Sequence, residues 1–246
     1  MSSKKLKRAP LKEVIFELRW EGSVDSPGMQ VDKGFDLAQG KFASKQEMDF
    51  PVYKKLLPDN APFKIFGSPL NQFWKGELKW PVIQHGQGVL AINDVEANYI
   101  WEDKFYPMIE STLKNLIESY NDPLKFTSVK LHYIDAWDTE EVQPIDFMRD
   151  NLQTDILNKY KISGKLRDFN IQQGFELDDG SILSLSISSG INNQSKKNSV
   201  IWNTVVEKMG KIGKDDIIPW LILAHTHTSD MFKNMLNPDF YASLDR

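Results

Sequence analysis

The amino-acid sequence predicts an α+β fold with antiparallel sheets and two long amphipathic helices. Several segments alternate apolar and polar residues with a period of two, which is typical of half-buried strands. Turn signals such as Asp179-Gly180 separate neighbouring segments of this kind, as expected for antiparallel hairpins. Two longer segments instead repeat apolar residues at helical spacing, and a proline lies near the start of each.

The first half of the chain is expected to begin with a strand over 13–20, in which Val14, Phe16 and Leu18 share one face. Prolines recur between residues 21 and 80. Because proline removes a backbone donor and restricts the residue before it, short helical or irregular pieces are expected there. The following pattern predicts strands over 82–84, 89–93 and 98–101 and a helix from Pro107 to about residue 120.

The second half has a similar order of elements. The sequence predicts a strand over 126–135, a helix over 144–158, a hairpin of strands 169–177 and 182–187, a strand over 200–206 and a helix over about 216–237. Each half opens with a strand that ends near a tryptophan, Trp20 or Trp137. These similarities raise the hypothesis of two pseudo-repeated halves, 1–123 and 124–246, either separate or packed as one domain.

Composition excludes several classes of protein. The chain has 246 residues and a net charge of −4, which argues against electrostatic binding of nucleic acid over the whole surface. It has no cysteine, so disulfides, thiolate nucleophiles and cysteine-ligated metals are excluded. No apolar run approaches the ~20 residues of a membrane span, and the first residues do not resemble a signal peptide. A cytoplasmic location is therefore expected.

Carboxylates near the end of the strand that starts at Phe126 are the main catalytic candidates. Asp135 and Asp138 flank Trp137, and carboxylates clustered at a strand end can bind Mg²⁺ or act as acid and base. Glu176 and His225 complete the candidate set for a metal-dependent nuclease or other hydrolase. The alternative interpretation of the two aspartates is a solvated acidic turn.

Two further patterns are similar to cofactor or metal motifs. Residues 86–91 spell the G-x-G-x-x-A of dinucleotide-binding loops, but a strand follows where a helix would be needed, so a glycine-bent hairpin is expected. His225 and His227 are two residues apart on an expected helix, where their side chains diverge, which favours packing over metal binding. The sequence therefore predicts no cofactor and no metal site.

The opening stretch 9–20 contains a Pro-Leu-Lys-Glu-Val strand, and further notable stretches are 84–93, 99–101, 223–225 and 231–232. Together they resemble a sporadically distributed family of uncharacterised bacterial proteins of about this length. The resemblance implies no established activity, cofactor or catalytic residue. The patchy occurrence of such a family is typical of mobile modules, which implies a toxin–antitoxin or phage-defence setting.

The main functional hypothesis is a non-catalytic binding or regulatory protein that acts on a partner protein. Exposed sheet faces or edges would provide the contact, and Trp101, Trp137 and Trp202 are candidate contact residues if they are exposed. One alternative is the metal-dependent nuclease or other hydrolase. Another is a nucleic-acid-binding protein, for which the net charge gives no support. No membrane contact is expected, and the oligomeric state is left open.

Overall fold

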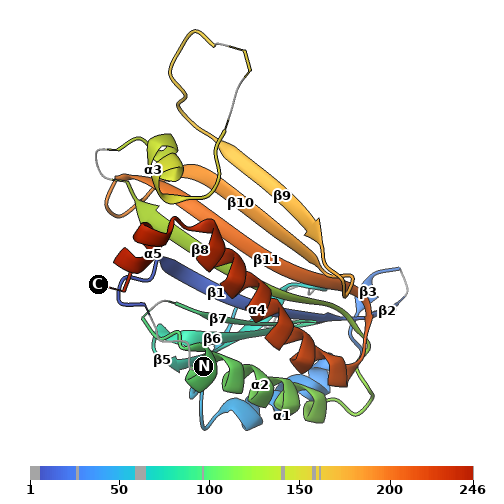
Figure 1. Ribbon diagram of the computed structural model, residues 1–246. Helices are drawn as coiled ribbons and strands as arrows, with labels where there is room; N and C mark the ends of the chain where they lie inside the picture. Colours follow the sequence, from blue (N-terminus) through green and yellow to red (C-terminus); the bar gives the residue numbers. More distant parts are fainter. Residues whose placement is uncertain are drawn as a thin grey trace. The chain divides into compact units, whose positions relative to one another are not determined.

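A computed structural model describes residues 6–25, 28–58, 65–95, 97–139, 142–156, 159–160 and 162–245 of the chain (Figure 1). The strands are β1 (Leu11–Trp20), β2 (Ser23–Val24), β3 (Gln30–Val31), β4 (Val52–Lys55), β5 (Pro69–Gly76), β6 (Lys79–Gly86), β7 (Val89–Asp94), β8 (Phe126–Asp138), β9 (Asn170–Glu176), β10 (Ile182–Ile191) and β11 (Asn198–Ile212). The helices are α1 (Phe35–Gln46), α2 (Tyr106–Ser119), α3 (Pro144–Asn151), α4 (Ile217–Met235) and α5 (Pro238–Ser243), with a π-helical turn η1 (Trp101–Phe105) and a 3₁₀ turn η2 (Lys214–Asp216).

Nine of the described strands are hydrogen-bonded in the order β4-β5-β6-β7-β1-β8-β11-β10-β9, and β2 pairs with β3. The pairs β1–β7, β4–β5, β5–β6, β6–β7 and β9–β10 are all antiparallel. A large antiparallel sheet accompanied by helices confirms the predicted α+β class.

The described chain forms two compact units whose segments alternate along the sequence. Unit 1 comprises Val14–Leu131 and Glu207–Leu221. Unit 2 comprises the described residues before Val14, His132–Val206 and the described residues from Ile222 onward. The predicted division into halves 1–123 and 124–246, either separate or packed as one domain, stays a prediction.

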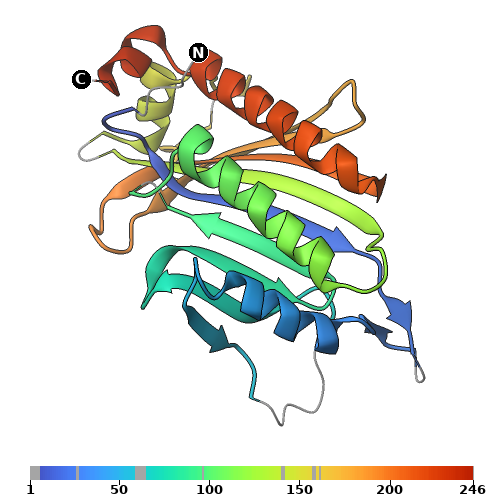
Figure 2. The same cartoon turned by 90° about the horizontal axis from the view of Figure 1, so that it is seen from below.

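The core of unit 1 lies between its sheet and the helices α1 and α2, which lie side by side on one face of that sheet (Figure 2). Strand periodicity turns Phe16 and Leu18 of β1 to this face, opposite Ile92 and Leu90 of β7. On α1, the ring of Phe42 makes an edge contact with Phe73 of β5 at 5.4 Å between centroids. The apolar stripe of α2 is buried as its helical spacing predicts, with Ile109, Leu113 and Leu116 inside.

The hairpin of β6 and β7 confirms the expectation for the Gly-x-Gly sequence. Gly86 pairs with Val89, and the chain turns at Gly88, whose φ is +71°. A side chain at position 86 would place its Cβ 2.1 Å from the carbonyl oxygen of Ser68. The first glycine is thus required by a close backbone approach and the second by the turn.

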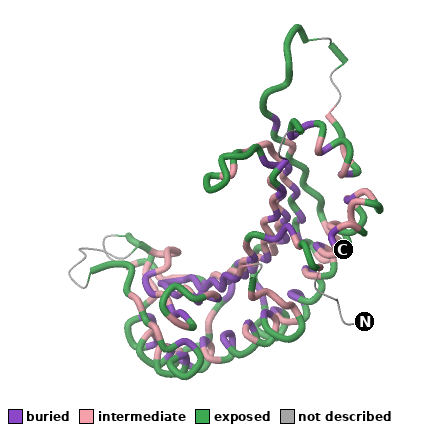
Figure 3. The backbone as a smooth tube through the Cα atoms, turned by 90° about the vertical axis from the view of Figure 1, so that its left-hand side faces the viewer, coloured by how far each residue is buried: buried purple, intermediate pink, exposed green. Residues whose placement is uncertain are grey.

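Unit 2 has an aromatic core. Trp137 of β8 lies 6.2 Å from Trp202 of β11 between ring centroids, and Phe232 of α4 stacks on Trp137 at an interplanar angle of 7°. Leu185 and Ile187 of β10 are buried in the same cluster, as their alternation with serine predicts. By contrast, residues 159–160 and 162–168, between α3 and β9, are all exposed (Figure 3).

Three expected elements differ from the observed ones. The strand expected over 98–101 is absent, because the chain enters the turn η1 and continues into α2. The helix expected over 144–158 ends as α3 at Asn151, because Leu152 is extended and forms a bridge with Leu236. The last two residues of the expected helix, 157 and 158, lie outside the described residues. The region 21–80, expected to hold short or irregular pieces, contains the 12-residue helix α1 and the strands β4 and β5.

Candidate functional site

Asp135 lies in the interior of unit 2. It shares a face of β8 with Tyr133 and Trp137, and α4 covers this face, because His225 contacts Tyr133 and Phe232 stacks on Trp137. The residue is 6% exposed. Burial raises the pKa of the Asp135 carboxyl to about 7, against the opposing charge of Lys12. This carboxyl is therefore a core group under a helix.

Asp138 organises the loop between β10 and β11. Its carboxylate accepts hydrogen bonds from Asn192 Nδ2 at 3.0 and 3.2 Å and from Ser195 Oγ at 3.0 Å. These bonds occupy both carboxylate oxygens, which gives Asp138 a structural role in an exposed loop. The neighbouring acidic residues 140 and 141 lie outside the described residues.

Glu176 and His225 do not join these aspartates. Glu176 is exposed at the end of β9, and β9 is separated from β8 by β11 and β10. Three strand spacings amount to about 14 Å, too far for the two strands to share one metal. His225 Nδ1 and the Tyr133 hydroxyl are joined by a hydrogen bond of 2.9 Å, and burial lowers the pKa of His225 to about 4. Within the described residues, no three histidine, aspartate or glutamate side chains are grouped to hold a metal ion.

Two of the three candidate contact tryptophans are core residues. Trp137 is 9% exposed and Trp202 is fully buried, with its indole donating to Thr204 Oγ1 at 2.6 Å. They were candidates for partner contact only if exposed, and they are not, because the unit 2 core forms around them. Trp101 is partly exposed on η1 and packs on Tyr106 at 5.7 Å between ring centroids.

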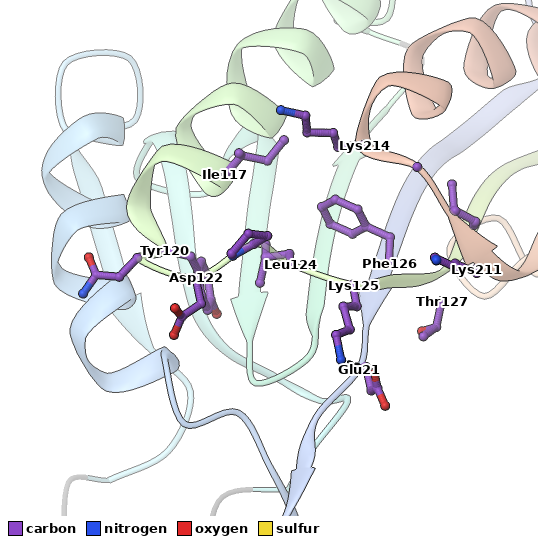
Figure 4. A pocket seen from close by; sticks show the side chains of 14 residues that line it. Glu21, Ile117, Tyr120, Asp122, Leu124, Lys125, Phe126, Thr127, Lys211 and Lys214 are labelled. Carbon is purple, nitrogen blue, oxygen red and sulfur yellow. Dashed lines mark ion pairs between the residues drawn. The ribbon is translucent and has the colours of Figure 1, made fainter.

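Unit 1 contains a pocket of about 840 Å³ that the sequence did not indicate (Figure 4). Three chain segments form it: Glu21 directly after β1, the end of α2 with the start of β8, and the end of β11 with the turn η2. Apolar side chains make up much of its lining, namely Ile117, Pro123, Leu124, Phe126 and Ile212. A pocket of this size lies in the range of known ligand sites.

Three lysines surround this apolar surface. Lys125, Lys211 and Lys214 line the pocket together with Glu21 and Asp122 (Figure 4). Lys125 Nζ lies 3.5 Å from a carboxylate oxygen of Glu21, and the backbone N–H of Glu21 donates to the carbonyl of Lys125 at 2.8 Å. The pocket therefore combines an apolar interior with an excess of positive charge at its rim.

Tyr120, which also lines the pocket, is held by the protein itself. Its hydroxyl donates to Asp32 Oδ2 at 2.7 Å, and the indole of Trp20 donates to the same oxygen at 2.8 Å. Burial and then the hydrogen bond to Asp32 raise the pKa of the Tyr120 phenol. This phenol therefore stays protonated, and its proton is committed to Asp32.

The chemistry of the lining favours binding over catalysis. Thr127 supplies an alcohol, but the lining includes no histidine that could activate it as a nucleophile. Glu21 is engaged with Lys125. No local sequence signal indicated this site, since 121–123 is typical of a helix end and the lysines near residue 211 follow much later in the chain.

A comparison of the chain with protein-family models, curated proteins and solved structures found no match. The resemblance to an uncharacterised bacterial family therefore stays a prediction. None of the described helices has the length and apolar character needed to span a membrane.

Proposed function

We propose that this protein is a non-catalytic binding protein whose pocket in unit 1 accepts an apolar side chain of a partner protein, flanked in the partner by carboxylates. The observation that carries this proposal is the combination of an apolar interior with Lys125, Lys211 and Lys214 at the rim. Apolar anchors that enter pockets supply most of the affinity in protein interfaces. Rim charges mainly supply orientation and specificity.

The positions of the polar groups favour a protein partner over a small molecule. Sites for small ligands usually fix their ligand with a few buried, convergent polar groups. Here the lysines are exposed, and the phenol of Tyr120 is already bonded to Asp32. Exposed charges hold a small anion weakly in water, whereas a partner that covers the rim would shield them from solvent.

Charge supports an acidic contact surface on the partner. The whole chain carries a net charge of −4. The pocket rim, with three lysines and two carboxylates, is positive and so has the opposite sign to the chain as a whole. The carboxylates of Glu21 and Asp122 would disfavour the closely spaced phosphates of a nucleic acid. The toxin–antitoxin or phage-defence setting stays a prediction from the family resemblance.

Site-specific photo-crosslinking in the native host tests this proposal. A benzophenone amino acid replaces Asp122, which is exposed and lines the pocket, and a control protein carries it at the exposed Asp168. We expect one stoichiometric protein adduct at position 122, attached through a segment with an apolar residue between Asp or Glu residues.

Charge reversal provides the matched comparison. The adduct should disappear in Lys211→Glu/Lys214→Glu and persist in Lys33→Glu/Lys165→Glu, which changes the net charge equally at exposed sites outside the pocket. An adduct that survives reversal of the rim lysines, or no adduct beyond that of the control position, would contradict the proposal.

A further inference from the structure

Among the described strands, β9 is the last in the sheet and is hydrogen-bonded to β10 alone (Figure 1). All its residues except Ile171 are exposed. Proteins usually protect such an edge with proline, lysine, a bulge or a covering segment. The seven residues Asn170–Glu176 include no proline and no lysine, and their register with β10 is uninterrupted. Glu176 is the one charged residue of the strand.

The pairing with β10 defines which backbone groups face outward. The Ser189 N–H donates to the Phe169 carbonyl at 3.0 Å, and the Leu177 N–H donates to the Ser181 carbonyl at 2.8 Å. Because hydrogen-bonding direction alternates along a strand, the odd-numbered residues of β9 direct their N–H and C=O groups to β10. The four even-numbered residues, from Asn170 to Glu176, therefore direct theirs to the open edge.

We propose that β9 of a second copy of this chain completes this edge, in antiparallel pairing about a two-fold axis through Gln173. In this register Gln172 lies opposite Gly174 of the second copy, and Asn170 lies opposite its Glu176. These are the residues whose backbone groups face outward. The two-fold axis repeats each of these two pairs, which gives four pairs. With two hydrogen bonds in each pair, about eight new backbone hydrogen bonds form.

The side chains of β9 are self-complementary in this register. Ile171 and Phe175 share a face with the buried residues of β10, since Ile171 pairs with Ile187 and Phe175 with Leu183. The two-fold axis places Ile171 opposite Phe175 of the second copy, which extends the apolar face across the junction. On the other face, Gly174 leaves open space, since a Cβ at this position would meet no atom within 4 Å. The side chain of Gln172 from the second copy fits into this space.

Charge and length favour a copy of this strand in this register. The two Glu176 carboxylates lie at opposite ends of the junction, each beside an asparagine, so no like charges meet. A shift of the axis by one residue leaves two residues of each seven-residue strand unpaired. An axis between residues would set the apolar face of one strand against the polar face of the other.

Single cysteines test the register directly, because the chain has none of its own. Gln173 and its symmetry mate form a pair that is not hydrogen-bonded, with Cα atoms about 4.5 Å apart, which a disulfide can span. We expect Gln173→Cys to form a disulfide-linked dimer under mild oxidation. Gln172→Cys, which faces a glycine, should remain unlinked.

Mixed samples check the same register a second time. Ile171→Cys and Phe175→Cys should crosslink when mixed, and neither should crosslink alone, because four residues of offset separate like positions by about 14 Å. Without oxidation, sedimentation of the wild-type protein should give twice the mass of the chain. Gln173→Lys places two like charges at the axis and should sediment as a monomer, whereas Ser184→Lys on β10 should remain dimeric.

Circular dichroism of each variant confirms that it is folded. A wild-type protein that sediments as a monomer at every accessible concentration would overturn the proposal. Equal crosslinking at positions 172 and 173, or a dimer that tolerates Gln173→Lys, would overturn it as well, because either result places the contact elsewhere.

Discussion

His85 is a buried base that has no hydrogen-bond partner among the described residues, and we predict that its replacement by leucine removes a large pH dependence of stability. Its ring lies among Phe42, Phe35 and Trp20, at 4.7, 5.0 and 6.2 Å between centroids. Neither ring nitrogen has a hydrogen-bond partner in the part of the chain that the structure describes. Burial lowers the pKa of His85 from its ordinary 6.5 to about 3.

The direction of the effect follows from these two pKa values. Because the folded chain holds the imidazole neutral down to pH about 3, the unfolded chain binds a proton first as the pH falls below 6.5. The free energy of unfolding therefore decreases with acidification between these values. At pH 5, which is about 1.5 pH units below the ordinary pKa, the free energy of unfolding is lower by about 2 kcal/mol, since each pH unit contributes about 1.36 kcal/mol. At neutral pH the unpaired ring nitrogens already cost about 1–3 kcal/mol.

Urea unfolding of the wild-type protein and His85→Leu at pH 7.5 and pH 5.0 tests this reasoning. The variant should be at least as stable as the wild type at pH 7.5, and its advantage should grow by about 2 kcal/mol at pH 5.0. Comparing the two proteins cancels the titration of all other groups. Leu90→Met, a change opposite His85 on β7, should show the same stability difference at both pH values. A difference between wild type and His85→Leu that does not change with pH would refute the neutral, unpaired state of His85.

Three further predictions concern single positions. Because the pKa of Asp135 is raised to about 7, its carboxyl destabilises the fold as the pH rises. In urea unfolding, the stability of Asp135→Asn relative to wild type should therefore increase by roughly 2–3 kcal/mol between pH 5 and pH 8. A relative stability that is the same at both pH values would contradict the burial of this carboxyl. Gly86→Ala sets a Cβ against the carbonyl of Ser68 and should cost more than about 2 kcal/mol, whereas Gly40→Ala, in open space within α1, should raise the melting temperature. Asp138→Ala should accelerate amide hydrogen exchange in the loop between β10 and β11 and cost less than about 1 kcal/mol; unchanged exchange would show that another group holds the loop.

The parts of the fold that the sequence predicted have local causes. Leu183, Leu185 and Ile187 alternate with serines because one face of β10 is buried and the other is not. Ile109 and Leu113 repeat at helical spacing because α2 buries a single stripe. Such elements carry their burial pattern within a few residues, so a short window of sequence is sufficient to recognise them.

Helix α1, which the sequence did not predict, lacks such a local burial pattern. It buries only Phe35, Ala38, Phe42 and Gln46 of its 12 residues, so its apolar stripe is narrow and includes a polar side chain. Its stability comes from packing on β5 and β6, to which Phe42 contributes through Phe73 and His85. Tertiary contacts of this kind leave little trace in the local sequence.

The candidate site was missed for a related reason. Phe126 and Lys211 come from distant parts of the chain, and each residue alone resembles an ordinary strand end. In contrast, the carboxylates near Trp137 form a conspicuous local cluster in the sequence. The structure separates them into a core group, Asp135, and a loop anchor, Asp138. Proximity in sequence was therefore a poor guide to shared chemistry.

The interleaved order of the two units limits how the gene can be divided. The segment Glu207–Leu221 belongs to unit 1 and contributes the buried side chains of Ile212, Ile217 and Trp220. A fragment that stops after residue 123 would lack these side chains as well as Phe126, and its apolar surface would be left in water. We therefore expect residues 1–123 expressed alone not to reproduce the core of unit 1. If the halves share an ancestor, the first has since come to share its core with residues encoded in the second.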